Sequence, residues 1–304
     1  MLGIIKQSIN RFSEDRCTVL AASLAYYTIF SLPPILFILV TTLTVSIGWY
    51  SGDQQAEDRA FAVVQQHVSE LIGNKEAEQE VGSIMESNRN SGGLGWKSLL
   101  SLGGVLVAAT GVVVTLQSSL NLVWRIKPDP ELSGWKDLIV KRLLSLLMIL
   151  ALGIVLLLSF VVNGILDAVS STVTEDTGWQ TQVAAVANFI VTFLIVTLII
   201  AAIFKFMPDA HIAWKDVWVG SFLTAVLFTV GRIAMSLYFS YSSPGQQLGA
   251  AAGSLVILLV WVYYSSLIVL FGAEFTQAYV QHRGRVIRPE SGSVKFVEKT
   301  VSTE

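Results

Sequence analysis

Arg232 is the residue whose type and position point to the most specific chemistry. It is the only charged residue between Val217 and Ala273, in a long apolar stretch. A guanidinium inside a membrane span costs about 2.5–3.5 kcal/mol on insertion scales, so it should face the bundle interior or water. It could bind an anionic group inside a cavity that opens to the outside. Alternatively, its long side chain could simply extend to the outer membrane surface.

A second candidate lies in the middle of the first apolar segment. Tyr26, Tyr27 and Ser31 precede the pair Pro33 and Pro34. Two adjacent prolines remove two backbone donors and interrupt a helix. In lipid the freed carbonyl groups need other partners, which confines such a break to protein interior or a wet cavity. Interrupted helices hold the substrate in many transporters, but a simple packing kink remains equally open.

The third candidate is Glu274, near the end of the last apolar segment. Small residues directly before it allow a neighbouring helix to approach, and the carboxylate then needs a donor. Lys205, Arg142 and Arg16 are predicted to lie at a similar depth. We favour a structural ion pair, with Lys205 as the partner, over a proton relay, because charges near helix ends seldom shift far.

The composition predicts the environment of these residues. Of 304 residues, 53% are hydrophobic and 14% are charged, and the mean hydropathy is +0.63. Soluble globular proteins carry about 25% charged residues. This deficit excludes a disordered chain, a cytosolic enzyme of ordinary composition and a basic nucleic-acid binder. The single cysteine, Cys17, excludes an intrachain disulfide and a cysteine-cluster metal site.

The sequence offers no recognisable catalytic machinery. The three histidines, His67, His211 and His282, fall on separate connections without an HxH or HExxH pair. No GxxxxGK[ST] or G-x-S-x-G pattern occurs. We therefore expect no enzyme, no cofactor and no metal site.

The elements that must position the candidates are membrane helices. A span needs about 20 apolar residues, and the charge-poor runs predict an all-α, polytopic membrane bundle of six transmembrane helices. We divide the chain into an interfacial helix (1–16), a transmembrane domain (17–280) and a polar, mobile cytoplasmic tail (281–304). The connection 50–97 is predicted to form one or two amphipathic helices outside the membrane. The six spans are placed near 18–49, 98–122, 140–166, 182–206, 216–240 and 250–279.

Charge in the connections predicts the orientation. Most of the 20 Lys and Arg residues fall on the side of the two termini, and the long connection on the other side holds Arg59, Lys75, Arg89 and Lys97. Basic connections favour the cytoplasm, so both termini are predicted to be cytoplasmic. Two of these connections resemble each other, since Pro128-Asp129 and Pro208-Asp209 each precede a Trp-Lys pair. This is a weak trace of a repeat, or an independent recurrence of helix-stopping residues.

Together these residues resemble the YihY/BrkB family of bacterial inner-membrane proteins, over about the first 280 residues. The resemblance implies six spans and a role in the cell envelope, where members have been linked to serum resistance, envelope integrity and export of lipid or another anionic amphiphile. An older label, ribonuclease BN, became attached to the family, and the scattered histidines here argue against it. Three motifs carry the resemblance. The first is Ala21–Tyr27 together with Ser31–Pro34, and the second is Pro208–Gly220. The third consists of Gly249, Gly253–Leu255, Trp261–Tyr264 and Gly272–Phe275.

Two functions from different classes follow as hypotheses. The first is a transporter or lipid-handling protein without its own ATPase, with Arg232, the interrupted first helix and the last two spans forming the pathway. The second is a non-catalytic structural or assembly scaffold for envelope integrity. The candidate partners are membrane lipids, an anionic lipid or other amphiphile as substrate, and a second copy of the chain. No nucleic acid is expected.

Overall fold

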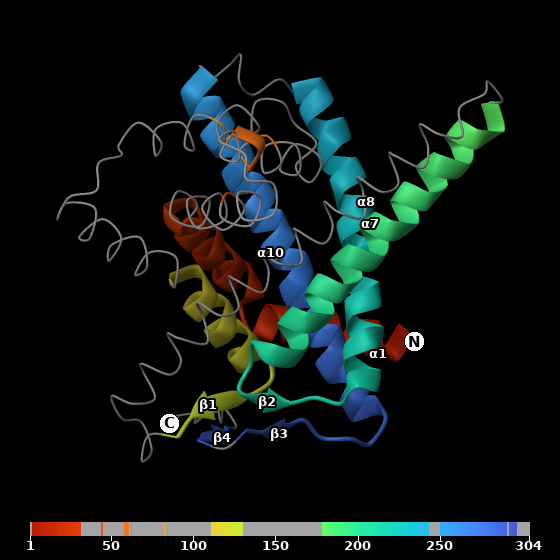
Figure 1. Cartoon of the computed structure of the whole chain (residues 1–304). Coiled ribbons are helices and arrows are strands. Elements are labelled where there is room, and N and C mark those ends of the chain that lie inside the picture. Colours follow the sequence, from red (N-terminus) through yellow and green to blue (C-terminus); the bar gives the residue numbers. More distant parts are fainter. Residues whose placement is uncertain are drawn as a thin grey trace.

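The computed structural model describes residues 2–31, 44, 58–60, 62, 82, 111–129, 178–242, 250–290 and 292–296, and these are mainly helical (Figure 1). The predicted span at 140–166, the prolines Pro33 and Pro34 and most of the connection 50–97 lie outside the described residues.

Three long helices form the centre of the described part: α7 (Gly178–Phe206), α8 (Trp214–Ser242) and α10 (Ala250–His282). Each contains a segment long and apolar enough to cross a membrane, and Cys17–Ser31 and Gly111–Val123 form two shorter apolar helices. Helix α8 packs against both α7 and α10. Helices are therefore confirmed at 182–206, 216–240 and 250–279, within a few residues of their predicted ends.

The end of α10 shows how a local signal turns the chain. Gly284 has a φ of 67°, a left-handed conformation that glycine adopts without the penalty of a side chain. The amide of Gly284 donates to the carbonyl of Gln281 at 2.9 Å, and the amide of Arg285 donates to that of Val280 at 3.0 Å. This is a Schellman motif, which satisfies the last carbonyls of the helix. It directs the following residues back under the bundle.

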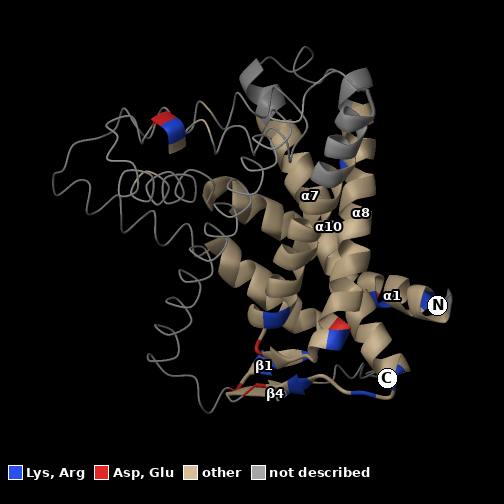
Figure 2. Ribbon diagram, turned by 45° about the vertical axis from the view of Figure 1, so that its right-hand side comes forward, with Lys and Arg blue, Asp and Glu red and all other residues tan. Residues whose placement is uncertain are grey.

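Helix α1 (Leu2–Glu14) confirms the predicted N-terminal helix and runs across the long helices (Figures 1 and 2). One face packs on α10, where Ile4 is buried against Phe275. Ile5 and Ile9 are exposed. Helix α1 thus presents separate apolar faces to α10 and to its surroundings.

The described part is mostly helical, as predicted, and four short strands accompany the helices. β1 (Ile126–Pro128) pairs with β4 (Ser293–Lys295), and β2 (Ala210–His211) pairs with β3 (Arg288–Pro289), both antiparallel. The prediction of a mobile tail is therefore wrong as far as residue 296. We call residues 285–290 and 292–296 the C-terminal strap. The strap is ordered because its backbone forms hydrogen bonds with β1 and β2, which follow the helix Gly111–Val123 and α7.

The strap bonds to both of the connections that resemble each other in sequence, accepting from one and donating to the other. The amide of Asp129 donates to the carbonyl of Gly292 at 2.9 Å, and the amide of Glu290 donates to the carbonyl of Asp209 at 3.0 Å. A single segment therefore ties together the connections that follow the helix Gly111–Val123 and α7.

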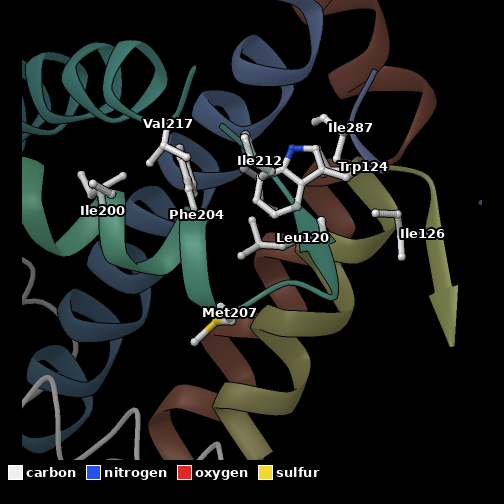
Figure 3. Close-up of a cluster of buried hydrophobic side chains, with 14 of the residues drawn as sticks. Leu120, Trp124, Ile126, Ile200, Phe204, Met207, Ile212, Val217 and Ile287 are labelled. Carbon is white, nitrogen blue, oxygen red and sulfur yellow. The ribbon is translucent and has the colours of Figure 1, made fainter. Parts of the chain in front are cut away.

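The main hydrophobic core contains residues of these strands and of the helices beside them (Figure 3). Trp124 packs edge-on against Phe204, with ring centroids 6.0 Å apart, and Ile287 from the strap is buried in the same cluster. Side chains from several distant segments meet here, including Leu120, Ile126, Met207, Ile212 and Val217. We call this end of the bundle, with its strands and core, the strand end, and the opposite end the far end.

Candidate functional site

Most of the charged residues in the described part of the chain lie at the strand end (Figure 2). Among them is a buried group that joins four segments of the chain. We call it the carboxyl cluster, and it consists of Arg11, Asp15, Cys17, Arg125 and Glu274.

Glu274 is the centre of the carboxyl cluster and is fully buried on α10. The thiol of Cys17 donates to its Oε1 at 3.7 Å, and its Oε2 is buried without a hydrogen-bond partner among the described residues. Asp15 in turn forms an ion pair with Arg125, with Nη2 to Oδ1 at 2.5 Å. The carboxyl of Glu274 thus lies in a group that holds a second acid, Asp15, and the guanidinium groups of Arg11 and Arg125.

Local structure explains how these groups reach one another. Asp15 lies in the two-residue turn between α1 and the helix Cys17–Ser31, where Arg16 has a left-handed φ of 49°. Arg125, with a φ of 58°, ends the helix Gly111–Val123 in a similar turn. The two turns bring the side chains of Asp15 and Arg125 together as an ion pair.

The contacts that the structure gives for Lys205 are with the connection from α7 to α8, and its expected pairing with Glu274 stays a prediction. Lys205 lies in the last turn of α7, where its Nζ donates to the carbonyl of Ile212 at 2.7 Å and lies 5.8 Å from the ring centroid of Trp214. Lys205 donates to Ile212 because the short connection from α7 to α8 brings this backbone carbonyl, seven residues further along the chain, close to its Nζ. Arg16 is exposed, and Arg142 lies outside the described residues.

Further polar contacts hold the strand end together. Asn121 and Asp209 form two hydrogen bonds, each of 2.9 Å, and Gln117 donates to the same aspartate at 3.2 Å. The strap residue Arg285 pairs with Asp216 at the start of α8 at 2.5 Å. In addition, Arg11 of α1 donates to Gln281 of α10 at 2.6 Å. Every one of these contacts joins segments distant in sequence.

Helices α8 and α10 interlock through small residues just above the carboxyl cluster. A side chain at Gly220 would overlap Thr276, and one at Gly272 would overlap Thr224. Each threonine donates to the carbonyl of the glycine four residues before it, at 2.7 Å. The reciprocal Gly-x-x-x-Thr spacing is a signal that was visible in the sequence and that we did not use.

The residues predicted to form a pathway occupy different helix pairs. Arg232 is half-buried on α8, next to Gly231, whose open side is filled by Tyr264 of α10. Tyr27 and Ser31 lie beside Gly111 on the helix Gly111–Val123, with Ser31 buried.

Tyr26 is exposed and packs against Phe30. The roles of Arg232, Tyr26, Tyr27 and Ser31 remain predictions, and Pro33 and Pro34 fall outside the described residues.

Sequence reasoning missed Asp15, Cys17 and Arg125 as site residues. No spacing rule could have found them, because Cys17 and Glu274 are 257 positions apart. In the part of the chain that the structure describes, no three His, Cys, Asp or Glu side chains come together in a way that could hold a metal ion. What the cluster can do is hold a proton or maintain a buried network of charges.

Comparison with known proteins places this arrangement in a family. Residues 8–295 match the family model described as virulence factor BrkB. A UPF0761 membrane protein of Pseudoalteromonas atlantica is 28% identical over 90% of this chain and 84% of its own length. Another, of Aliivibrio salmonicida, is 26% identical over 97% of this chain and 88% of its own length.

A UPF0761 membrane protein of Albidiferax ferrireducens is 25% identical over 90% of this chain, which spans only 63% of that relative's length. No solved structure matches. The relatives are named as membrane proteins, without a catalytic name, and the described part of this chain has helices that can cross a membrane. The chain is a membrane protein of the BrkB virulence-factor family, which includes the UPF0761 membrane proteins.

Proposed function

We propose that this protein is a transporter or lipid-handling protein of the bacterial inner membrane, without its own ATPase. In this proposal it has six transmembrane helices, and both termini lie in the cytoplasm. The strand end then faces the cytoplasm, which agrees with the basic residues that gather there (Figure 2).

The observation that carries the proposal is the carboxyl cluster. A bundle that only has to be stable in lipid can pack through small residues, as α8 and α10 do at Gly220 and Gly272. Burying ionisable groups such as Asp15 and Glu274 adds a large desolvation penalty, and ionisable groups within membrane segments usually serve a function. Polar contacts can separate and re-form, so a buried polar cluster that holds the helices together at the strand end suits a protein that opens and closes at that end.

Arg232 is the proposed contact for substrate. A guanidinium in a low-dielectric setting binds phosphate or carboxylate strongly, which favours an anionic lipid or another anionic amphiphile. Tyr26, Tyr27 and Ser31 would line the same path on the first helix. This assignment rests on residue types and on the half-buried position of Arg232.

The test is lipid transport in proteoliposomes that contain the full chain. Fluorescent phosphatidylglycerol and phosphatidylcholine serve as anionic and zwitterionic probes of equal chain length. We expect Arg232→Ala to slow movement of phosphatidylglycerol about tenfold, equivalent to ~1.4 kcal/mol, and Arg232→Lys to retain part of the activity. Lys215→Ala, an exposed basic residue at the start of the same helix, is the matched control and should have no effect.

The scaffold hypothesis makes the opposite prediction. The α8–α10 interlock favours it, because reciprocal contacts of this kind fix two helices relative to each other. If folded wild-type protein moves neither probe, transport of these lipids is rejected and the scaffold remains. If wild type moves both probes and Arg232→Ala does so at the same rate, the role of Arg232 is rejected.

A further inference from the structure

The contacts of α1 with α10 show which side of α1 faces which end of the bundle. Phe12 packs edge-on against Phe271, with ring centroids 6.0 Å apart, whereas Arg11 donates to Gln281. Since α10 begins at the far end and finishes at the strand end, Phe271 lies nearer the far end than Gln281 does. The side of α1 that carries Phe12 is therefore turned toward the far end.

The residues of α1 are sorted along this direction. Residues three or four positions apart share one side of a helix, so Ile5 and Ile9 lie on the same side as Phe12. Ile5 is 41% exposed and Ile9 is 55% exposed, and we call Ile5, Ile9 and Phe12 the apolar edge. Helix α1 thus changes from apolar to polar in the direction from the far end to the strand end. The side turned toward the strand end carries Gln7, Asn10 and Glu14.

Two tryptophans show the depth at which α1 crosses the bundle. Trp214 and Trp218, in the first turns of α8, are each 45% exposed, and exposed tryptophans of membrane proteins gather at the level of the lipid headgroups. Val219, next to Trp218, packs against the small core that Ile4 of α1 forms with Phe275. Helix α1 therefore lies at the depth of a membrane–water interface.

The exposed part of the apolar edge fits a lipid leaflet. An amphipathic helix at this depth lies in the plane of the interface, with its apolar side chains among the acyl chains and its polar side chains in water. Ile5 and Ile9 face the hydrocarbon in this arrangement, because the long helices run from the interface into it. Lys6 is exposed beside them, where its long side chain can extend to a lipid phosphate. The first turns of α1 extend sideways past α8, so lipid can surround them (Figures 1 and 2).

We propose that the apolar edge of α1 binds the lipid leaflet at the strand end, with Ile5 and Ile9 among the acyl chains and Lys6 at the phosphate groups. The bilayer is the partner, rather than a second copy of the chain, because a protein partner would not require the apolar edge to face along the long helices. The contact fixes the depth of α1 and, through Phe12 and Arg11, that of the end of α10. It requires that the chain crosses a membrane, but not that it transports lipid.

Photolabelling of the wild-type chain in phosphatidylcholine vesicles tests this contact without a substitution. The lipids carry a photoreactive diazirine in the acyl chain. Trypsin then releases residues 7–11, which contain Ile9, and residues 286–295, which contain the exposed strap residue Val286. We expect label on residues 7–11 and on the far half of α7, and at least about tenfold less on residues 286–295, because the strap lies beyond the acyl chains. If α7 is labelled and residues 7–11 are not, the proposal is overturned.

Spin labels compare the two sides of α1 directly. Ile9→Cys and Asn10→Cys, each in a Cys17→Ala chain, place a nitroxide on the apolar edge and on the polar side at neighbouring positions. In lipid nanodiscs we expect the ratio of collision rates with oxygen and with a water-soluble nickel chelate to be about threefold higher at position 9, because oxygen concentrates in hydrocarbon. Equal ratios would place α1 in water, and exclusion of both reagents at position 9 would show that protein covers the apolar edge, so either result rejects the proposal. If Cys17→Ala does not fold, the photolabelling of wild-type protein decides.

Discussion

The two halves of α8 differ in how deeply their core-facing side chains are buried. Near the strand end, Val217 is 0% exposed, and Thr224 and Ala225 are also buried. Toward the far end, Val230 is 59% exposed and Leu237 is 56% exposed. The difference teaches that an apolar run identifies a membrane helix but does not say which part of it forms the protein core.

The strand end and the far end also differ in the kinds of contact that they contain. The strand end combines the carboxyl cluster, the α8–α10 interlock and the C-terminal strap within the space of a few helical turns. The far half of α7 presents exposed apolar side chains such as Phe189 and Ile190. Since lipid is as apolar as leucine, the far half gains little from packing, and the stability of the bundle should be concentrated at the strand end.

The largest effect is expected where the two long helices interlock. Gly272→Leu would force a side chain into the space of Thr224 and should lower the free energy of unfolding by about 3 kcal/mol or more. Gly3→Leu is the matched control, because nothing lies within 4 Å of a side chain added at Gly3. Thermal unfolding in detergent compares the two variants.

A size exchange makes this prediction sharper. Gly272→Ala combined with Thr224→Ala should be more stable than Gly272→Ala alone, because the second change removes the atoms that clash. If the double variant is no more stable, or if Gly272→Leu unfolds like wild type, the interlock does not hold the strand end together.

A smaller effect is expected in the strap, where two neighbours have opposite exposure. Ile287 is 6% exposed and Val286 is 63% exposed. Ile287→Ala should leave a cavity beside Trp124 and cost about 2 kcal/mol, whereas Val286→Ala should change stability by less than ~0.5 kcal/mol. Proteolysis of the tail by trypsin, followed over time, gives an independent measure. Equal digestion of both variants would mean that Ile287 does not anchor the strap.

The smallest effect is expected from the same substitution, valine to alanine, made once in each half of α8. Val217→Ala should destabilise the protein by about 1 kcal/mol, because the core cannot fully close over the lost methyl groups. Val230→Ala should have almost no effect, since lipid or detergent fills the space. Equal losses at both positions, measured by thermal unfolding, would show that the far half is as tightly packed as the strand end.

Part of the candidate site was visible in the sequence. Arg232 and Glu274 stood out because a charge in an apolar run is rare, and the structure shows Glu274 buried at a meeting point of helices. The neighbours of Glu274 in the carboxyl cluster could not be predicted, because depth in the membrane places Lys205 and Asp15 at similar levels but does not say which side of α10 each one reaches. The role of Arg232 stays a prediction.

The sequence by itself determined the membrane class, the family and the bounds of α7, α8 and α10 to within a few residues. These properties depend on local composition, since charge-free runs must be helical in lipid to satisfy their own backbone. Only the tertiary structure decided that the tail folds back as the strap and that Cys17, Asp15 and Glu274 meet. Those contacts join residues far apart in the sequence, 257 positions in the case of Cys17 and Glu274, and their geometry depends on how the helices pack, which no local pattern encodes.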